Sequence, residues 1–306
     1  MFRPPFLSVV ACFKNESHIL EEWIEHCQRQ GVDKLLLCDN GSTDDYQSII
    51  DKYDNIVLYE DSSDEIQWST EPPRGKYGGG IYSKLLTYHK TEWAIICDVD
   101  EFMYAREGYD TIRQFLKERG SEFNQLIVPN ILFHHKGGTD LSIKEQPESV
   151  VDTFIYSCKR DKNVKCIVKT DSIIKLRVHE HAVKGRSTRP HLKDDFVLTE
   201  GTANSKYGSL PIVPKGGMKG CPPGGAKGTM WRFYPNDGKV YVHSNHYRFQ
   251  SEDHFFKNKL KKGYADRNNE EAMKKQSRMK EWWAANSKEY SIDTELRDNK
   301  NGIKEN

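Results

Sequence analysis

The feature that most constrains the fold is an alternation of short apolar runs and amphipathic segments over the first 130 residues. Apolar residues between positions 19 and 27 recur at helical spacing, and Gly31 is a natural helix stop. Strands separated by helices imply βαβ units and a mostly parallel sheet, so we predict a Rossmann-like α/β domain. Strands are expected at 7–13, 34–38, 56–59, 93–97 and 126–128, and helices near 19–27, 46–53, 81–90 and 111–119.

The second half of the sequence is less regular and predicts a smaller, more antiparallel region. Residues 208–228 hold seven glycines and four prolines, a composition typical of a long loop. From about Ser291 the sequence is polar, and we expect a frayed tail. Strands are expected near 151–158, 164–169, 172–178 and 239–243, and helices at 252–262 and about 270–285.

Composition excludes some classes of protein. The 46 basic and 45 acidic side chains nearly cancel, to a net charge of +1, so bulk charge gives no reason to expect nucleic-acid binding. No apolar run approaches the roughly 20 residues that span a bilayer, and the N-terminus lacks a signal-peptide cleavage site. Cys12, Cys38 and Cys97 lie in apolar runs and the sequence has no C-x-x-C pair, so we expect buried free thiols and a cytoplasmic protein.

Asp98 and Asp100 are the most informative polar residues. They follow directly after the apolar run 93–97, and ligands of open α/β sheets bind beyond the carboxyl ends of strands. Two carboxylates at i and i+2 can converge on one cation, and oxygen ligands favour Mg²⁺ or Mn²⁺. Such a cation would bind a diphosphate and neutralise its charge as it leaves. The alternative interpretation is an ordinary acidic loop.

Several motifs occur in an order that resembles glycosyltransferase family 92 and related family-2-like enzymes. They are residues 12–16 (CFKNE), 20–26 (LEEWIEH), 39–44 (DNGSTD) and 93–102 (WAIICDVDEF). A C-terminal motif follows at 245–248 (NHYR), with Ser251 and a Lys-rich segment that ends at Gly263. The match spans about residues 7–263, and its middle is weak. The resemblance implies a GT-A fold, a divalent cation (Mn²⁺ or Mg²⁺), a nucleotide-sugar donor such as a UDP-sugar, a glycan or glycoprotein acceptor, and inversion at the sugar carbon.

The same resemblance divides the sequence into regions. Residues 1–265 become a GT-A domain, with a nucleotide-sugar half at 1–130 and an acceptor half at 131–265, and residues 266–306 a C-terminal helix and polar tail. Contacts to the nucleotide-sugar are implied for a set of residues after the first, second and fourth expected strands and on the helix before the fourth. That set is Cys12, Asn15, Glu16, Asp39, Lys84, Asp98 and Val99.

Some of these positions have structural alternatives. Asp39 ends the second expected strand, where an acid can accept hydrogen bonds from a base or ribose or can cap the turn at Gly41. Asn15 and Glu16 follow the first strand, where a helix start can face a nucleotide, or where they serve with Ser17 as helix caps. Lys84 resembles a basic position that faces the diphosphate, although a lysine on a helix is commonly solvated.

A third metal ligand and a catalytic base remain to be placed. By resemblance His246 binds the metal with Asp98 and Asp100, and His243 is the nearby alternative. An inverting transferase needs a base that deprotonates the acceptor hydroxyl. Glu180 fits best by position and joins Asp100 as a predicted catalytic residue. The open alternatives for the base are Asp152, Asp171 and Asp237, and the run His179-Glu180-His181 could bind metal or form an exposed turn.

Two other functions compete with glycosyl transfer. A D-x-D phosphatase would use Asp98 as its nucleophile, but that motif ordinarily follows the first strand of its domain. A non-catalytic nucleotide-sugar-binding protein could share the same fold. We also expect the loop 208–228, which carries Lys215, Lys219 and Lys227, to close over a bound donor or to be a passive surface loop.

Overall fold

The computed structural model describes the residues that surround the predicted site. They are residues 3–62, 76–78, 80–134, 145–177, 179–188, 231–233, 240–251, 253–255 and 291–300. The loop expected at 208–228 and the helix expected at 270–285 lie outside them, as does most of the helix expected at 252–262. Among the described residues no helix is both long and apolar enough to cross a membrane.

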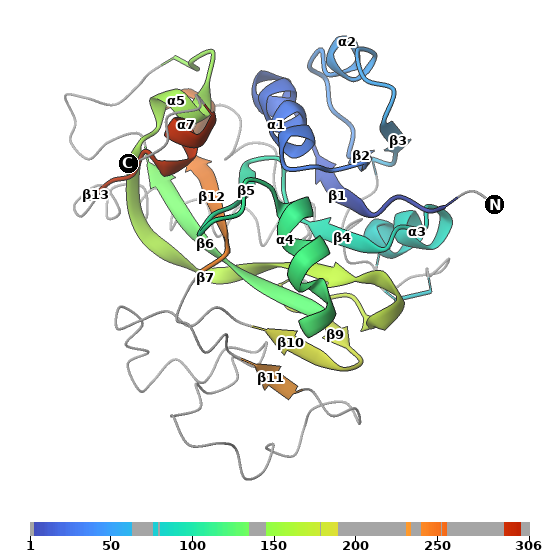
Figure 1. The fold of residues 1–306 in the computed structure, drawn as a ribbon. Coiled ribbons are helices and arrows are strands. Elements are labelled where there is room, and N and C mark those ends of the chain that lie inside the picture. Colours follow the sequence, from blue (N-terminus) through green and yellow to red (C-terminus); the bar gives the residue numbers. More distant parts are fainter. Residues whose placement is uncertain are drawn as a thin grey trace.

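The first half of the chain builds four parallel strands with helices between them (Figure 1). β4, β1, β2 and β3 are neighbours in that order, and each neighbouring pair runs parallel. The strands are β1 (Leu7–Phe13), β2 (Lys34–Asp39), β3 (Ile56–Glu60), β4 (Trp93–Ile96) and β5 (Glu101–Ala105), and the helices are α1 (Ser17–Arg29), α2 (Gln47–Ile50), α3 (Gly80–Tyr88) and α4 (Ile112–Arg119). The predicted α/β class with a mostly parallel sheet is confirmed.

The second half extends this sheet with antiparallel pairings. β7 runs antiparallel to β4 on one side and to β6 on the other, so the long β6 and β7 join the two halves of the molecule (Figure 1). β12 lies between β5 and β6. The elements are η1 (Gly120–Glu122), β6 (Gln125–His134), α5 (Val150–Thr153), β7 (Tyr156–Lys169), η2 (Thr170–Ser172), β8 (Ile173–Lys175), β9 (Ala182–Val183), β10 (Arg186–Thr188), β11 (Trp231–Phe233), β12 (Val242–Phe249), β13 (Ser291–Ile292) and α7 (Glu295–Lys300).

Helix α1 shows how the apolar spacing fixes the core. Its inward face buries Ile19, Leu20, Trp23, Ile24 and Cys27, which pack with alternate residues of β1 and β2. The Trp23 indole also donates a hydrogen bond to the carbonyl of Glu101, 3.0 Å away. This contact anchors the beginning of β5 on the helix. The thiols of Cys12, Cys38 and Cys97 are buried and free, as predicted.

Three expectations about local structure are wrong, and one strand was not predicted. The strand expected at 239–243 is β12, Val242–Phe249, and the strand expected at 151–158 begins instead with the short helix α5. β5 was not expected, because its five residues follow the acidic run without a turn signal. The tail is not frayed over residues 291–300: β13 pairs with β7, and Leu296 of α7 is buried.

Candidate functional site

The polar residues predicted at strand ends do come together. β1, β2 and β4 are parallel neighbours, so their carboxyl ends meet at one edge of the sheet. Asp98 and Asp100 follow β4, Asn15 and Glu16 follow β1, and Asp39 ends β2. This is the edge where an open α/β sheet binds its ligands.

Hydrogen bonds tie together the loops that follow β1 and β2. The Asn15 amide oxygen accepts the backbone N–H of Thr43 at 2.7 Å, and the Asn15 N–H donates to the Ser42 hydroxyl at 2.9 Å. Asp44 accepts the N–H of Ser17, also at 2.7 Å. Asn15 has φ 52°, a left-handed conformation that asparagine tolerates better than most residues. These hydrogen bonds therefore hold the loop after β1 against the loop after β2, at the same sheet edge as the acidic residues.

Asp39 has the geometry of a turn cap. Its buried carboxylate accepts the backbone N–H groups of Ser42 at 2.9 Å and of Gly41 at 3.2 Å. Gly41 has φ +76°, which explains why the turn carries glycine there. The structure thus favours the capping interpretation, and a nucleoside contact by Asp39 stays a prediction.

Four other residues predicted to contact the nucleotide-sugar differ in their surroundings. Lys84 donates to the Tyr59 hydroxyl, and its ammonium lies 4.1 Å from the centre of the Tyr59 ring. Cys12, Glu16 and Val99 are all buried. A role for any of them in donor binding remains a prediction, and for Lys84 such a role requires it to leave Tyr59.

The acidic run after β4 surrounds a buried lysine that sequence reasoning missed. The Lys165 ammonium of β7 lies 2.9 Å from Asp98 Oδ2 and 3.0 Å from Glu101 Oε2. Glu101 is buried, and its other oxygen accepts the Asn130 amide N–H at 2.8 Å. The backbone N–H of Asp98 also donates to Glu101, at 3.1 Å. Glu101 therefore organises the loop that carries the two aspartates.

These contacts shift the pKa values of Lys165, Glu101 and Asp98 in different directions. Burial alone would lower the pKa of Lys165, but Asp98 and Glu101 raise it more, so the ammonium stays charged. Burial raises the pKa of Glu101 despite the neighbouring lysine. For Asp98, burial raises the pKa, but Lys165 and, less strongly, His246 together lower it, so the pKa of this carboxyl lies below its ordinary value. Asp98 is also the more accessible acid, since 41% of its side chain is exposed against 4% for Asp100.

His246 lies beside Asp100, and His243 does not. His246 Nε2 is 3.5 Å from Asp100 Oδ1, and the backbone N–H of Tyr247 donates to the Asp100 carbonyl at 2.8 Å. His243 is three residues earlier on β12, so its side chain points to the opposite face, where Nδ1 lies 3.3 Å from Arg106 Nη1. Of the two histidines, only His246 is placed to act with Asp100.

The Asp100–His246 pair fits a divalent cation. Neighbouring ligands of an ion with bonds of about 2.1 Å lie about 3.0–3.4 Å apart, close to the 3.5 Å seen here. Asp98 shares one oxygen with Lys165, but a carboxylate has about four lone-pair sites, so the lysine does not occupy the whole group. Asp100 and His246 thus lie at the spacing of two metal ligands, whereas the described residues do not bring Asp98 to ligand distance from both, and its part in a metal site remains a prediction.

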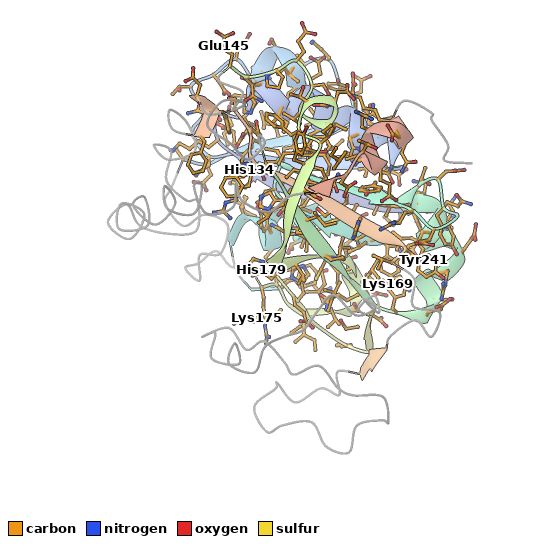
Figure 2. The ribbon with its side chains drawn as sticks, turned by 90° about the vertical axis from the view of Figure 1, so that its left-hand side faces the viewer. His134, Glu145, Lys169, Lys175, His179 and Tyr241 are labelled. Carbon is orange, nitrogen blue, oxygen red and sulfur yellow. The ribbon has the colours of Figure 1, made fainter. Side chains whose placement is uncertain are left out.

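The proposed base segment lies beside β7. The Cys166 thiol donates to the carbonyl of His179, labelled in Figure 2, at 2.9 Å. Cys166 is adjacent to Lys165 on β7, so the segment that carries Glu180 contacts the strand that carries Lys165, although adjacent strand residues point to opposite faces. His181 is not part of an exposed turn: it is buried, its N–H donates to Gln125, and burial lowers its pKa to about 3.

The alternative bases differ in position. Asp152 lies on α5, where its carboxylate is 2.9 Å from the Lys300 ammonium of α7. Asp171 is an exposed residue of η2. Asp237 lies outside the described residues. The choice among these bases is not decided by their positions, and Glu180 remains a prediction.

Two signals in the sequence could have identified the missed residues. Glu101 extends the acidic run by one residue. Lys165 interrupts the otherwise apolar run 164–168, which is typical of a buried lysine with an acidic partner. Asn130 gives no comparable signal.

Comparison with known proteins places this cluster in a family context. Residues 83–198, which include Asp98, Asp100, Lys165 and Glu180, match the sequence model of glycosyltransferase family 92. A glycosyltransferase family 92 protein of Ricinus communis is 24% identical over 173 residues, which cover 56% of this chain. The aligned part spans 30% of that relative's length. The resemblance to family 92 is confirmed by both findings.

Solved structures align with the chain more loosely. HddC of Yersinia pseudotuberculosis is 11% identical with a TM-score of 0.31, over 55% of this chain and 78% of its own. The 4-diphosphocytidyl-2C-methyl-D-erythritol synthase of Anaerococcus prevotii is 16% identical with a TM-score of 0.27, over 56% and 72%. Glucosyl-3-phosphoglycerate synthase of Mycobacterium tuberculosis, in complex with Mn²⁺ and UDP, is 14% identical with a TM-score of 0.30, over 55% and 58%.

Proposed function

We propose that this protein is a metal-dependent, inverting GT-A glycosyltransferase. It moves a sugar from a nucleotide-sugar, most simply a UDP-sugar, to a hydroxyl group of a glycan or glycoprotein. The observation that carries the proposal is the position of Asp98 and Asp100, at the ligand-binding edge of the sheet and inside the segment that matches family 92.

In this proposal Asp98, Asp100 and His246 hold Mn²⁺ or Mg²⁺. When bound, the metal supplies positive charge that stabilises the departing nucleoside diphosphate. Glu101 holds the loop by accepting a hydrogen bond from the Asp98 N–H. The Tyr247 N–H holds Asp100 by donating to the Asp100 carbonyl. Lys165 prevents Glu101 and Asp98 from adding two uncompensated negative charges beside a diphosphate.

Glu180 is the proposed base. It takes the proton of the acceptor hydroxyl as the oxygen attacks the sugar carbon, on the face opposite the leaving diphosphate. A bond forms between the acceptor oxygen and the sugar carbon, the bond from that carbon to the diphosphate oxygen breaks, and the nucleoside diphosphate leaves. Replacing Glu180 with Gln should lower the rate of transfer with little change in donor affinity.

Release of nucleoside diphosphate tests the proposed function. The wild-type protein should release UDP from a UDP-sugar in the presence of Mn²⁺ and acceptor, and should stop when a chelator is added. Asp98→Asn and Asp100→Asn should each lose transfer at limiting Mn²⁺, because removing one carboxylate lowers the metal affinity of the site. Asp110→Asn, at an exposed position, is the matched control and should remain active.

Three other outcomes have definite meanings. Near-native transfer by Asp98→Asn or Asp100→Asn at limiting Mn²⁺ contradicts the metal assignment. Release of inorganic phosphate without an acceptor indicates a phosphatase. Binding of donor with no release of UDP, across a panel of nucleotide-sugars and acceptors, indicates a non-catalytic binding protein.

A further inference from the structure

A second group of metal-ligating side chains lies where the start of α1 meets the segment after β12. Glu16, His18 and His254 offer ligand atoms that all lie within 4.8 Å of one another. His18 Nε2 is 3.7 Å from Glu16 Oε2, and His254 Nε2 is 3.9 Å from the same oxygen. The three residues come from segments far apart in sequence, so only the fold brings them together.

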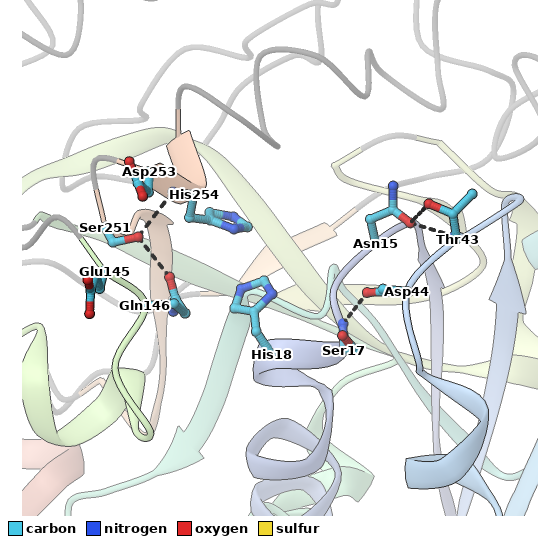
Figure 3. A pocket seen from close by; sticks show the side chains of 10 residues that line it. All are labelled: Asn15, Ser17, His18, Thr43, Asp44, Glu145, Gln146, Ser251, Asp253 and His254. Atoms are coloured by element: carbon cyan, nitrogen blue, oxygen red, sulfur yellow. Dashed lines mark hydrogen bonds between the residues drawn. The ribbon is translucent and has the colours of Figure 1, made fainter.

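The spacing of these atoms fits a tetrahedral ion. Zinc bonds of about 2.0–2.1 Å place tetrahedral ligands about 3.4 Å apart, a few tenths of an ångström less than the distances seen here. The rings of His18 and His254 have centroids 4.3 Å apart and are tilted by 49°, and Figure 3 shows them facing one another. Binding of zinc therefore requires the three side chains to draw together by a few tenths of an ångström or more.

The surroundings have the features of a supported metal site. Glu16 and His254 are 3% exposed, and His18 is partly exposed. The Ser251 hydroxyl accepts the N–H of His254 at 3.1 Å and donates to Gln146 at 3.1 Å, which fixes the backbone that carries the histidine. Such outer contacts orient metal ligands in known sites.

The site opens into a pocket. His18 and His254 line a cavity of about 460 Å³ together with Asn15, Asp44, Gln146 and Asp253 (Figure 3). Two histidines, one carboxylate and an accessible fourth position make up the ligand set of zinc sites that carry a water or a substrate atom. The pocket supplies the space that the fourth ligand needs.

One contact must change when a metal binds. His18 Nε2 donates to Gln250 Oε1 at 2.8 Å, and the same oxygen accepts the Gln146 amide N–H at 2.9 Å. Binding at Nε2 requires the ring proton to move to Nδ1 and this bond to break, while Gln250 keeps its bond to Gln146. The rearrangement is local, since the two backbones need not move.

We propose that Glu16, His18 and His254 form a zinc site that is distinct from the Asp98, Asp100 and His246 site. Its two imidazoles favour Zn²⁺, whereas the aspartates after β4 favour the harder Mn²⁺ or Mg²⁺. The bound zinc ties the start of α1 to the segment after β12, and it presents its fourth position to the pocket.

Titration of the chelator-treated full chain with ZnCl₂, without nucleotide, tests this proposal. We expect one zinc bound per chain at the proposed site, with affinity at least about tenfold weaker in His18→Ala and His254→Ala, because each removes one of three protein ligands. His18 is partly exposed, so its variant should fold even if His254→Ala does not. His89→Ala and Asp100→Asn are controls and should bind zinc as the wild type does.

A thermal readout accompanies the titration. Zinc should raise the melting temperature of the wild type and of Asp100→Asn clearly more than that of His18→Ala, because a weaker site gains less binding free energy at the same zinc concentration. Absence of zinc binding by the wild type overturns the proposal. Undiminished binding by His18→Ala, or loss of binding by Asp100→Asn, also overturns it, because the zinc then lies elsewhere.

Discussion

At the scale of single residues, the site depends on how one lysine and one histidine are shared among three acids. Lys165 contacts Asp98 and Glu101 directly, and Asp100 lies instead beside His246. This arrangement gives the two aspartates different surroundings: Asp98 is partly exposed and contacts a lysine, and Asp100 is buried beside an imidazole. A metal bound at this edge would compete with Lys165 for Asp98 but not for Asp100.

The Lys165–Glu101 pair should contribute strongly to stability. Lys165→Met leaves the Glu101 carboxylate buried without its cation, which typically costs about 3–5 kcal/mol of unfolding free energy. Urea unfolding measures the loss, and Lys169→Met on the same strand is the control with little expected effect. Adding Glu101→Gln to Lys165→Met should recover part of the lost stability. If Lys165→Met unfolds at the same urea concentration as Lys169→Met, the pair is not stabilising.

Residue-level prediction from the sequence succeeded where the chemistry is local. Asp98 and Asp100 could be placed at a strand end because the apolar run before them is unambiguous. The Lys165 contact could not be predicted, because it joins residues 67 positions apart and depends on the antiparallel register of β7 against β4. Asn130 was missed for the same reason, since its contact to Glu101 requires β6 and β5 to lie on either side of β12.

At the scale of elements, the parallel half could be predicted and the antiparallel half could not. Each βα unit of the first half carries its own apolar spacing and turn residues. β12 instead holds His, Ser, Asn and Tyr in a strand that is buried along nearly its whole length. Its polar sequence is not typical of a core strand, and its place between β5 and β6 is decided by tertiary pairing. Polar residues are needed there because the strand carries His246 to the site.

The turn between α1 and β2 gives an element-scale prediction. Gly31 has φ +83°, and a Cβ there would lie 2.5 Å from Arg113 Cβ of α4. Gly108 also has positive φ, +91°, but a Cβ there would meet nothing within 4 Å. Both Gly→Ala changes incur backbone strain of about 1 kcal/mol, and Gly31→Ala adds the clash with α4. Gly31→Ala should therefore lower the melting temperature more than Gly108→Ala does. Equal shifts would show that α4 moves away from the added methyl group with no loss of stability.

At the scale of the whole molecule, two buried histidines join segments that are far apart in the sequence. The buried histidines His26 and His181 hold backbone segments together rather than facing the pocket. His26 Nε2 donates to the Met103 carbonyl at 2.6 Å, which fastens α1 to β5. Burial lowers the pKa of His26 to about 4 and that of His181 to about 3. The fold thus prefers both imidazoles neutral.

This preference makes stability depend on pH in a definite direction. Unfolded histidine takes up a proton near its ordinary pKa of 6.5, while folded His26 does so only near 4, so stability is complete above the first value and falls as pH drops between the two. From pH 7 to pH 5 the loss should be about 2 kcal/mol for each of the two buried histidines. His26→Gln keeps a donor for Met103 and should remove about half of that slope in urea unfolding. An unchanged slope would mean that His26 does not govern it.

The proposed transfer requires a cation at Asp98, Asp100 and His246 that binds a nucleoside diphosphate. Calorimetric titration of UDP in the presence of Mn²⁺ measures this most directly, with His246→Ala and His243→Ala as a matched pair on opposite faces of β12. We predict Mn²⁺-dependent binding of UDP by the wild type and by His243→Ala, and binding at least about tenfold weaker in His246→Ala, because only His246 lies beside Asp100. Equal, undiminished affinity in both variants, with each shown to be folded, would contradict the account.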